Sequence, residues 1–120
     1  EEKLLSLMRK AVCLLAPLPE DRRSQSRFPT KIGYYLCSAR PVVTNAIGDV
    51  TKYLQDYKNA FVTKNCDAKQ FALRIEYILN NKEVSNKICA AGRSLAMQKF
   101  HYSVACNGFG EFLKEVIKNY

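Results

Sequence analysis

The chain has 120 residues, a length that allows one domain with a single hydrophobic core. Its 48% hydrophobic and 25% charged residues are typical of a globular protein and exclude a disordered or collagen-like chain. The longest apolar run, residues 11–18, is far shorter than the roughly 18 residues of a membrane span, and no signal peptide pattern is visible. The net charge of +8 is the most unusual global property of the sequence.

In the first half of the chain, helical and strand patterns alternate. Residues 1–10 have helical spacing, and the apolar run at 11–17 is typical of a strand buried on both faces of a parallel sheet. A polar loop follows at 18–28. Pro29 is a favoured first-turn residue and predicts a helix there, and a second strand is predicted at 40–45.

The second half continues this alternation. Asp49 is placed to cap a short helix to about residue 55, and a third strand is predicted at 59–63. The capping box Asp67-x-x-Gln70 opens an amphipathic helix. Further helices are predicted at 83–99 and after a capping Ser103. The whole pattern predicts an α/β fold of Rossmann-like, three-layer type, with a small parallel sheet of about three strands flanked by helices.

A three-stranded parallel sheet is thin. The first strand, residues 11–17, has little polar patterning, so its free edge would be apolar and unpaired. We therefore expect either a second chain at this edge or a larger sheet of which this chain is one part. The absence of an initial Met also suggests a fragment.

The cysteines and the histidine do not form a recognisable chemical motif. No Cys-x-x-Cys pair occurs and there is a single histidine, so we predict no metal site and no disulfide framework. We expect buried, reduced thiols in a cytoplasmic protein. His101 is assigned to the loop before the last helix rather than to a general base. The cysteines are Cys13, Cys37, Cys66, Cys89 and Cys106.

The loop after Pro17 is the best candidate for a binding site. Ligands of parallel sheets lie beyond the carboxyl ends of the strands, and this loop leads from such an end into a helix N-terminus that favours phosphate. Four cations lie within ten residues, namely Arg22, Arg23, Arg27 and Lys31. A diphosphate is the ligand class that this arrangement favours, and a solvated basic loop is the alternative.

The same stretch carries a family resemblance. It reads Ser26-Arg27-Phe28-Pro29-Thr30-Lys31-Ile32-Gly33-Tyr34-Tyr35-Leu36, followed by Arg40-Pro41-Val42-Val43. This resembles the Phe-Pro-x-Lys-Ile-x-Glu-Tyr-Leu-Ala-x-Gly-Lys-Pro-Val-Val pattern of retaining GT-B glycosyltransferases of the group 1 type. Asp56-Tyr57-Lys58-Asn59-Ala60 and Phe100 also resemble later family motifs, so the likeness covers nearly all of the chain.

The resemblance implies a fold, a substrate and a set of site residues. Residues 1–120 would be a single partial donor-binding domain, the second half of a GT-B C-terminal domain, and the N-terminal half of the parent would be missing. The substrate would be a nucleotide-diphosphate sugar, with no separate cofactor and an unknown acceptor. The sugar or phosphate would face Ser26 and Arg27, the diphosphate would lie at Phe28, Pro29, Thr30 and Lys31, and the ribose would lie at Tyr34.

Four positions depart from the family pattern. Ser26 and Tyr34 occupy the places of two glutamates, and a tyrosine hydroxyl cannot accept two hydrogen bonds from a ribose as a carboxylate can. Ala39 and Tyr57 replace glycines, which would cost about 1 kcal/mol or more each if the backbone there has positive φ. Catalysis by this chain alone is not expected, although the parent would be a transferase.

Two other functions stay open at this point. A catalytically degenerate, glycosyltransferase-like scaffold is suggested by the two missing carboxylates. A nucleic-acid-binding module is suggested by the charge of +8, although the cations outside residues 22–31 are scattered along helices. The basic surface also allows a peripheral association with an anionic membrane, but no strongly basic amphipathic helix supports it.

Overall fold

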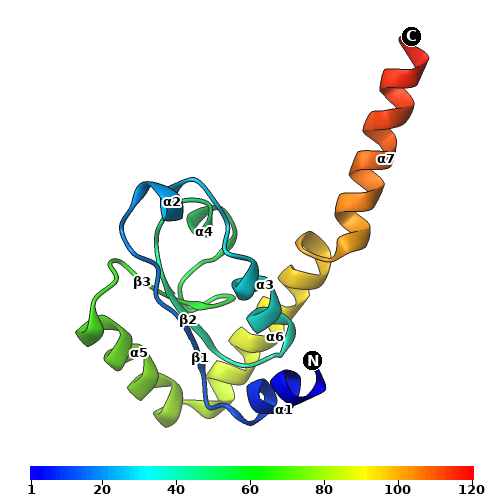
Figure 1. Ribbon diagram of the computed structural model, residues 1–120. Helices are drawn as coiled ribbons and strands as arrows, with labels where there is room; N and C mark the ends of the chain where they lie inside the picture. Colours follow the sequence, from blue (N-terminus) through cyan, green and yellow to red (C-terminus); the bar gives the residue numbers. More distant parts are fainter.

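Three short parallel strands form the centre of the computed structural model, which describes all 120 residues (Figure 1). They are β1 (Leu14–Ala16), β2 (Val42–Asn45) and β3 (Phe61–Thr63), in the order β1-β2-β3. In the register of the sheet, Leu14 pairs with Val42, and Val43 pairs with Phe61. All four residues of β2 are buried, because this strand has a neighbour on each side and helices over both faces.

The chain has seven helices, and the sheet forms the middle of three layers, with helices on both of its faces. Val42 and Val62 point to one face, where α3 packs on them, and Val43 and Phe61 point to the other face, which α5 covers. Helix α6 packs along α3, and α7 extends away from the body of the molecule (Figure 1). The helices are α1 (Glu2–Lys10), α2 (Arg22–Gln25), α3 (Thr30–Cys37), α4 (Val50–Tyr53), α5 (Ala68–Asn80), α6 (Lys82–Lys99) and α7 (Tyr102–Lys118). None of them is long and apolar enough to cross a membrane.

The α/β fold and the three strands predicted from the sequence are confirmed. The prediction of a polar loop at 18–28 is wrong in one respect, because this segment contains the short helix α2. The carboxylate of Asp21 accepts a hydrogen bond from the Ser24 amide at 2.8 Å and so caps this single turn.

The N-terminal caps of the later helices differ in detail from the prediction. Asp67 does accept the amide of Gln70 at 3.2 Å, but the Gln70 side chain accepts from the amide of Lys64 instead of completing the capping box. The predicted cap by Ser103 is wrong. Nδ1 of His101 accepts the Ser103 amide at 3.3 Å, so α7 begins one residue after the histidine.

The prediction of buried thiols holds for one cysteine. Burial raises the pKa of Cys89 to about 11, and it also raises the pKa of the half-buried Cys13. The prediction is wrong for Cys37, Cys66 and Cys106, which are exposed. Two of these three lie on helices, where the sequence gives no strong indication of which face is turned to solvent.

The edge of the sheet at β1 has no partner strand. Leu15 on β1 is 43% exposed, and the leucines of the neighbouring helix α1, namely Leu4, Leu5 and Leu7, are also exposed. A groove of about 470 Å³ lies beside this edge, between β1 and the first turns of α5. Its lining residues are Leu15, Pro17, Cys66, Asp67, Ala68, Phe71, Ala72 and Ile75. The apolar free edge expected from the sequence is therefore present.

Candidate functional site

The loop that leaves β1 is fixed by polar side chains at the carboxyl end of β2. Asn45 accepts the amide of Leu18 at 2.8 Å and donates its side-chain amide to the Leu18 carbonyl at 3.0 Å. The hydroxyl of Thr44 donates to the Ala16 carbonyl at 2.8 Å. Both side chains are buried, so these bonds form where water does not compete with them. The start of the candidate loop is thereby held against the central strand.

The loops that follow β1 and β2 touch each other at this edge of the sheet. Gly48 has a φ of 54°, and a Cβ atom there would lie 2.5 Å from the carbonyl oxygen of Ser24. A glycine is therefore required both by the backbone conformation and by the space. Beside this contact, the amide of Ser24 lowers the pKa of the Asp21 carboxyl, with smaller contributions from Arg23 and Arg27.

The N-terminus of α3 follows directly and offers free hydrogen-bond donors. Pro29 is buried at the N-cap position and has no side chain that could cap the helix. The amides of Thr30 and Lys31 donate to no other group of the protein. Because the helix dipole places positive charge at the same point, this end of α3 favours an anion.

The four cations of the predicted site lie on α2, just after it, and in the first turn of α3. All four are exposed, and none of them forms an ion pair. These residues are Arg22, Arg23, Arg27 and Lys31.

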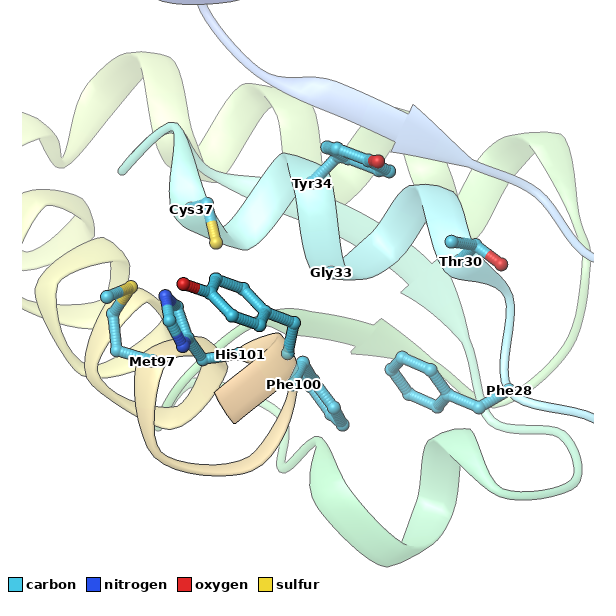
Figure 2. Close-up of a pocket in the computed structure, with 9 residues that line it drawn as sticks. Phe28, Thr30, Gly33, Tyr34, Cys37, Met97, Phe100 and His101 are labelled. Atoms are coloured by element: carbon cyan, nitrogen blue, oxygen red, sulfur yellow. The ribbon is translucent and has the colours of Figure 1, made fainter. Parts of the chain in front are cut away.

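A groove with a volume of about 490 Å³ runs along α3 and is closed on its other side by the junction of α6 and α7 (Figure 2). We call it the α3 groove. Six of its nine lining residues are hydrophobic, and none is a carboxylate. Its size is typical of small-molecule sites. The lining residues are Phe28, Thr30, Gly33, Tyr34, Cys37, Met97, Phe100, His101 and Tyr102.

The structure brings three of the seven predicted site residues into this groove. Thr30 and Tyr34 lie one helical turn apart, and Tyr34 is 64% exposed and points away from the Phe100 side of α3 (Figure 2). Phe28 lies at one end, stacked on Phe100 with ring centroids 4.6 Å apart and in edge contact with Tyr53 at 5.5 Å. Phe28 therefore positions the loop by packing.

The other four predicted residues lie outside the groove. Ser26 ends α2, and its hydroxyl donates to the carbonyl of Arg23 at 3.2 Å. Pro29 is buried, whereas Arg27 and Lys31 are exposed beside the N-terminus of α3. The predicted stretch thus has two parts, a cationic helix end and a largely apolar groove that starts at it.

Sequence reasoning missed the far wall of the groove. Met97, His101 and Tyr102 were not among the predicted site residues, because they are more than sixty residues away from Tyr34 in the chain. The consecutive rings Phe100-His101-Tyr102 between two helices were the one signal that could have indicated them.

A family model described as glycosyl transferases group 1 matches residues 2–95. The chain belongs to this family. The match extends from α1 into α6, and it confirms the resemblance that the sequence indicated. No curated protein matches the sequence.

Solved structures share the fold of this chain. Two crystal structures of HepE from Anabaena, one in complex with UDP-glucose and one with UDP, superpose on 91% of this chain with TM-scores of 0.76 and 0.77 and 19% identity. At this identity the likeness shows the fold. The group 1 glycosyltransferase chain described here covers 29% of the HepE chain.

Proposed function

We propose that this chain forms the part of a glycosyltransferase that binds the nucleotide-diphosphate sugar donor. The observation that carries the proposal is the uncapped N-terminus of α3, with the free amides of Thr30 and Lys31 among unpaired cations, in a member of the group 1 family. HepE, which shares the fold, was crystallised with UDP-glucose and with UDP.

The proposed chemistry is stabilisation of the departing diphosphate. Transfer of the sugar leaves negative charge on that group, and preorganised donors aimed at developing charge are a strong source of rate enhancement. We assign this role to the amides at Thr30 and Lys31, the Lys31 ammonium group and the α3 dipole. Ser26 and Arg27 are assigned to the sugar or the phosphates, and Tyr34 is assigned to one ribose hydroxyl.

The apolar edge of the sheet is proposed to bind a further part of the parent protein or a second chain. The unpaired strand β1 and the exposed leucines of α1 support this assignment, because such an edge is rarely left open to water. A cytoplasmic location, with or without contact to an anionic membrane surface, stays a prediction, and so does the identity of the acceptor.

A non-catalytic scaffold is the second candidate. Its support is the lack of the two family glutamates, since serine and tyrosine stand at positions 26 and 34. Such a protein would bind no nucleotide, whereas the donor-binding proposal requires a nucleotide diphosphate to bind at the α3 N-terminus.

A titration separates the two candidates. We expect UDP, GDP or ADP to shift the NMR amide signals of residues 26–36, and the double variant Arg27→Ala/Lys31→Ala to weaken binding by tenfold or more, because two charge-assisted contacts are lost. Lys114→Ala and Lys118→Ala, at exposed cations of α7, are the matched controls, and both variants should bind the nucleotide as tightly as the unsubstituted chain does. A folded protein that shows no shift with any of the three nucleotides would contradict the proposal and favour the scaffold.

A further inference from the structure

A second pocket lies at the end of the sheet opposite to the candidate site. It has a volume of about 350 Å³ and is lined by residues 10–12, which precede β1, by residues 40–41, which precede β2, and by the end of α5 and the start of α6. We call it the α6 pocket. Figure 1 shows α1 and the α5–α6 junction at the end of the sheet far from α2 and α4. The N-terminus of α3 lies at the carboxyl ends of the strands, so a ligand of the α6 pocket would not meet the proposed donor.

The side chains around the α6 pocket carry positive charge only. Lys10, Arg40 and Lys82 line it, all three are exposed, and none of them forms an ion pair. No carboxylate is among the lining residues. Burial raises the pKa of Cys89 on α6 to about 11, and the charge of Arg40 opposes this rise, which places the guanidinium close to α6. Three unpaired cations at one pocket favour an anion.

The N-terminus of α6 opens at this pocket without a capping side chain. Asn81 is the N-cap residue, but its side-chain amide donates to the Tyr77 carbonyl at the end of α5, at 2.9 Å. The first amides of a helix have no partner within the helix, and the dipole places positive charge at the same end. Glu83 in this first turn is exposed, does not line the pocket and forms no ion pair. The helix end therefore adds free donors to the three cations.

A buried hydroxyl without a partner is the independent sign of a ligand. Ser85 lines the pocket and is only 2% exposed, and its Oγ atom has no hydrogen-bond partner. Buried hydroxyls are almost always hydrogen-bonded, because an unpaired one loses its bonds to water without replacement. The other unpaired buried atom, Nε of Arg74, belongs to a guanidinium that already binds Asp56 at 2.6 Å. An acceptor oxygen seated against the first turn of α6 would supply the partner that Ser85 lacks.

We propose that the α6 pocket binds a phosphate group, either as free phosphate or as the phosphate of a small monoester. A phosphate has several acceptor oxygens for the Ser85 hydroxyl and the first amides of α6, and its charge of about −2 suits the three cations better than that of a carboxylate. The volume of the pocket leaves room for a small organic group beside the phosphate. This inference does not depend on donor binding at α3.

The first test is a titration of the complete chain in a phosphate-free buffer. Inorganic phosphate and glycerol 3-phosphate are added separately, and we expect saturable shifts of the NMR amide signals of residues 82–86. The double variant Arg40→Gln/Lys82→Gln should weaken this binding by tenfold or more, because two charge-assisted contacts are lost. Lys64→Gln/Lys69→Gln removes the same charge from two exposed lysines outside the pocket and should bind as tightly as the unsubstituted chain.

Ser85→Ala distinguishes a ligand contact from a packing role. Because the hydroxyl has no partner in the free protein, its removal should leave the Tm without phosphate unchanged or higher. We expect the same variant to show a smaller rise of the Tm on addition of phosphate, since a ligand stabilises the folded protein according to its affinity. A Ser85→Ala protein with a lower Tm in the absence of phosphate would show that the hydroxyl is already paired, which overturns the proposed contact.

Three further outcomes would overturn the site. They are the absence of saturable shifts at residues 82–86, equal affinities of the two double variants, and an equal rise of the Tm with phosphate for Ser85→Ala and the unsubstituted chain. Where phosphate does bind as expected, the comparison of the two ligands identifies the source of the group. Tighter binding of glycerol 3-phosphate assigns the pocket to a monoester, and tighter binding of inorganic phosphate assigns it to the free anion.

Discussion

Ala39 adopts a left-handed backbone conformation, with a φ of 55°, in the turn between α3 and β2. A residue with a Cβ atom is strained in this region by about 1–2 kcal/mol, whereas glycine is not strained there. The greater entropy of glycine in the unfolded chain offsets part of this gain, so we expect Ala39→Gly to raise the free energy of unfolding by a net amount of about 0.5–1 kcal/mol. Urea denaturation followed by circular dichroism measures the change.

Tyr57 gives the matched contrast, because its φ is 59° but its ring is packed. The ring lies 4.9 Å from that of Tyr77 and 5.6 Å from that of Phe61, and the Arg74 guanidinium lies 4.8 Å above it. We therefore expect Tyr57→Gly to lower stability in spite of the relieved strain. If Ala39→Gly also lowers stability, the backbone strain at positions 39 and 57 is smaller than the value of about 1–2 kcal/mol expected for a positive φ.

Helix α6 approaches the loop before β3 so closely that one position accepts no side chain. A Cβ atom on Gly92 would overlap the carbonyl oxygen of Asn59 and lie 2.9 Å from a methyl group of Leu36. We expect Gly92→Ala to lower the free energy of unfolding by about 1–3 kcal/mol, because α6 would have to move away from the turn and from α3. Thermal or urea unfolding measures the loss.

The same substitution on α7 is the control for this effect. No atom lies within 4 Å of a Cβ placed on Gly108 or Gly110. Alanine there should strengthen the helix by up to about 1 kcal/mol, because its helix propensity is higher. A neutral Gly92→Ala would show that the close contact between α6 and the turn is not needed for stability. A destabilising Gly108→Ala would show that a loss at position 92 does not report on that contact alone.

The sequence predicted those elements whose pattern is local. The strands are recognisable because Val42-Val43 and Phe61-Val62 lie in short apolar runs, and the cap at Asp67 is set by residues three positions apart. Helix α2 escaped prediction because a single turn has no hydrophobic periodicity. The positive φ values at Ala39 and Tyr57 were predictable through the family pattern, in which glycines stand there.

Only the part of the candidate site that lies around the N-terminus of α3 was predictable from the sequence. The cationic loop and the α3 N-terminus form a continuous stretch of sequence, so their proximity follows from the chain itself. The far wall of the α3 groove comes from α6 packing on α3, a contact between residues that are far apart in the sequence. Neither helical spacing nor composition determines where the α6–α7 junction meets α3.

The unpaired edge of β1 is the apolar part of the sheet that stays exposed to water. Leu15 and three leucines of α1 are exposed, and Leu15 lines the apolar groove beside α5. A parallel sheet with an open apolar edge is expected to recruit another strand. We therefore expect the chain studied by itself to self-associate in a concentration-dependent manner, as measured by sedimentation velocity.

A charge placed at this edge should prevent that association. Leu15→Lys is expected to shift the protein toward the monomer with little loss of stability, because residue 15 is already 43% exposed and a lysine at a strand edge opposes further pairing. Leu73→Lys, at a 59% exposed position of α5 outside the groove, should leave the association unchanged. If Leu15→Lys and Leu73→Lys lower the self-association equally, the effect comes from net charge alone. If the unsubstituted chain is monomeric at all concentrations, the β1 edge does not recruit the strand of a second copy.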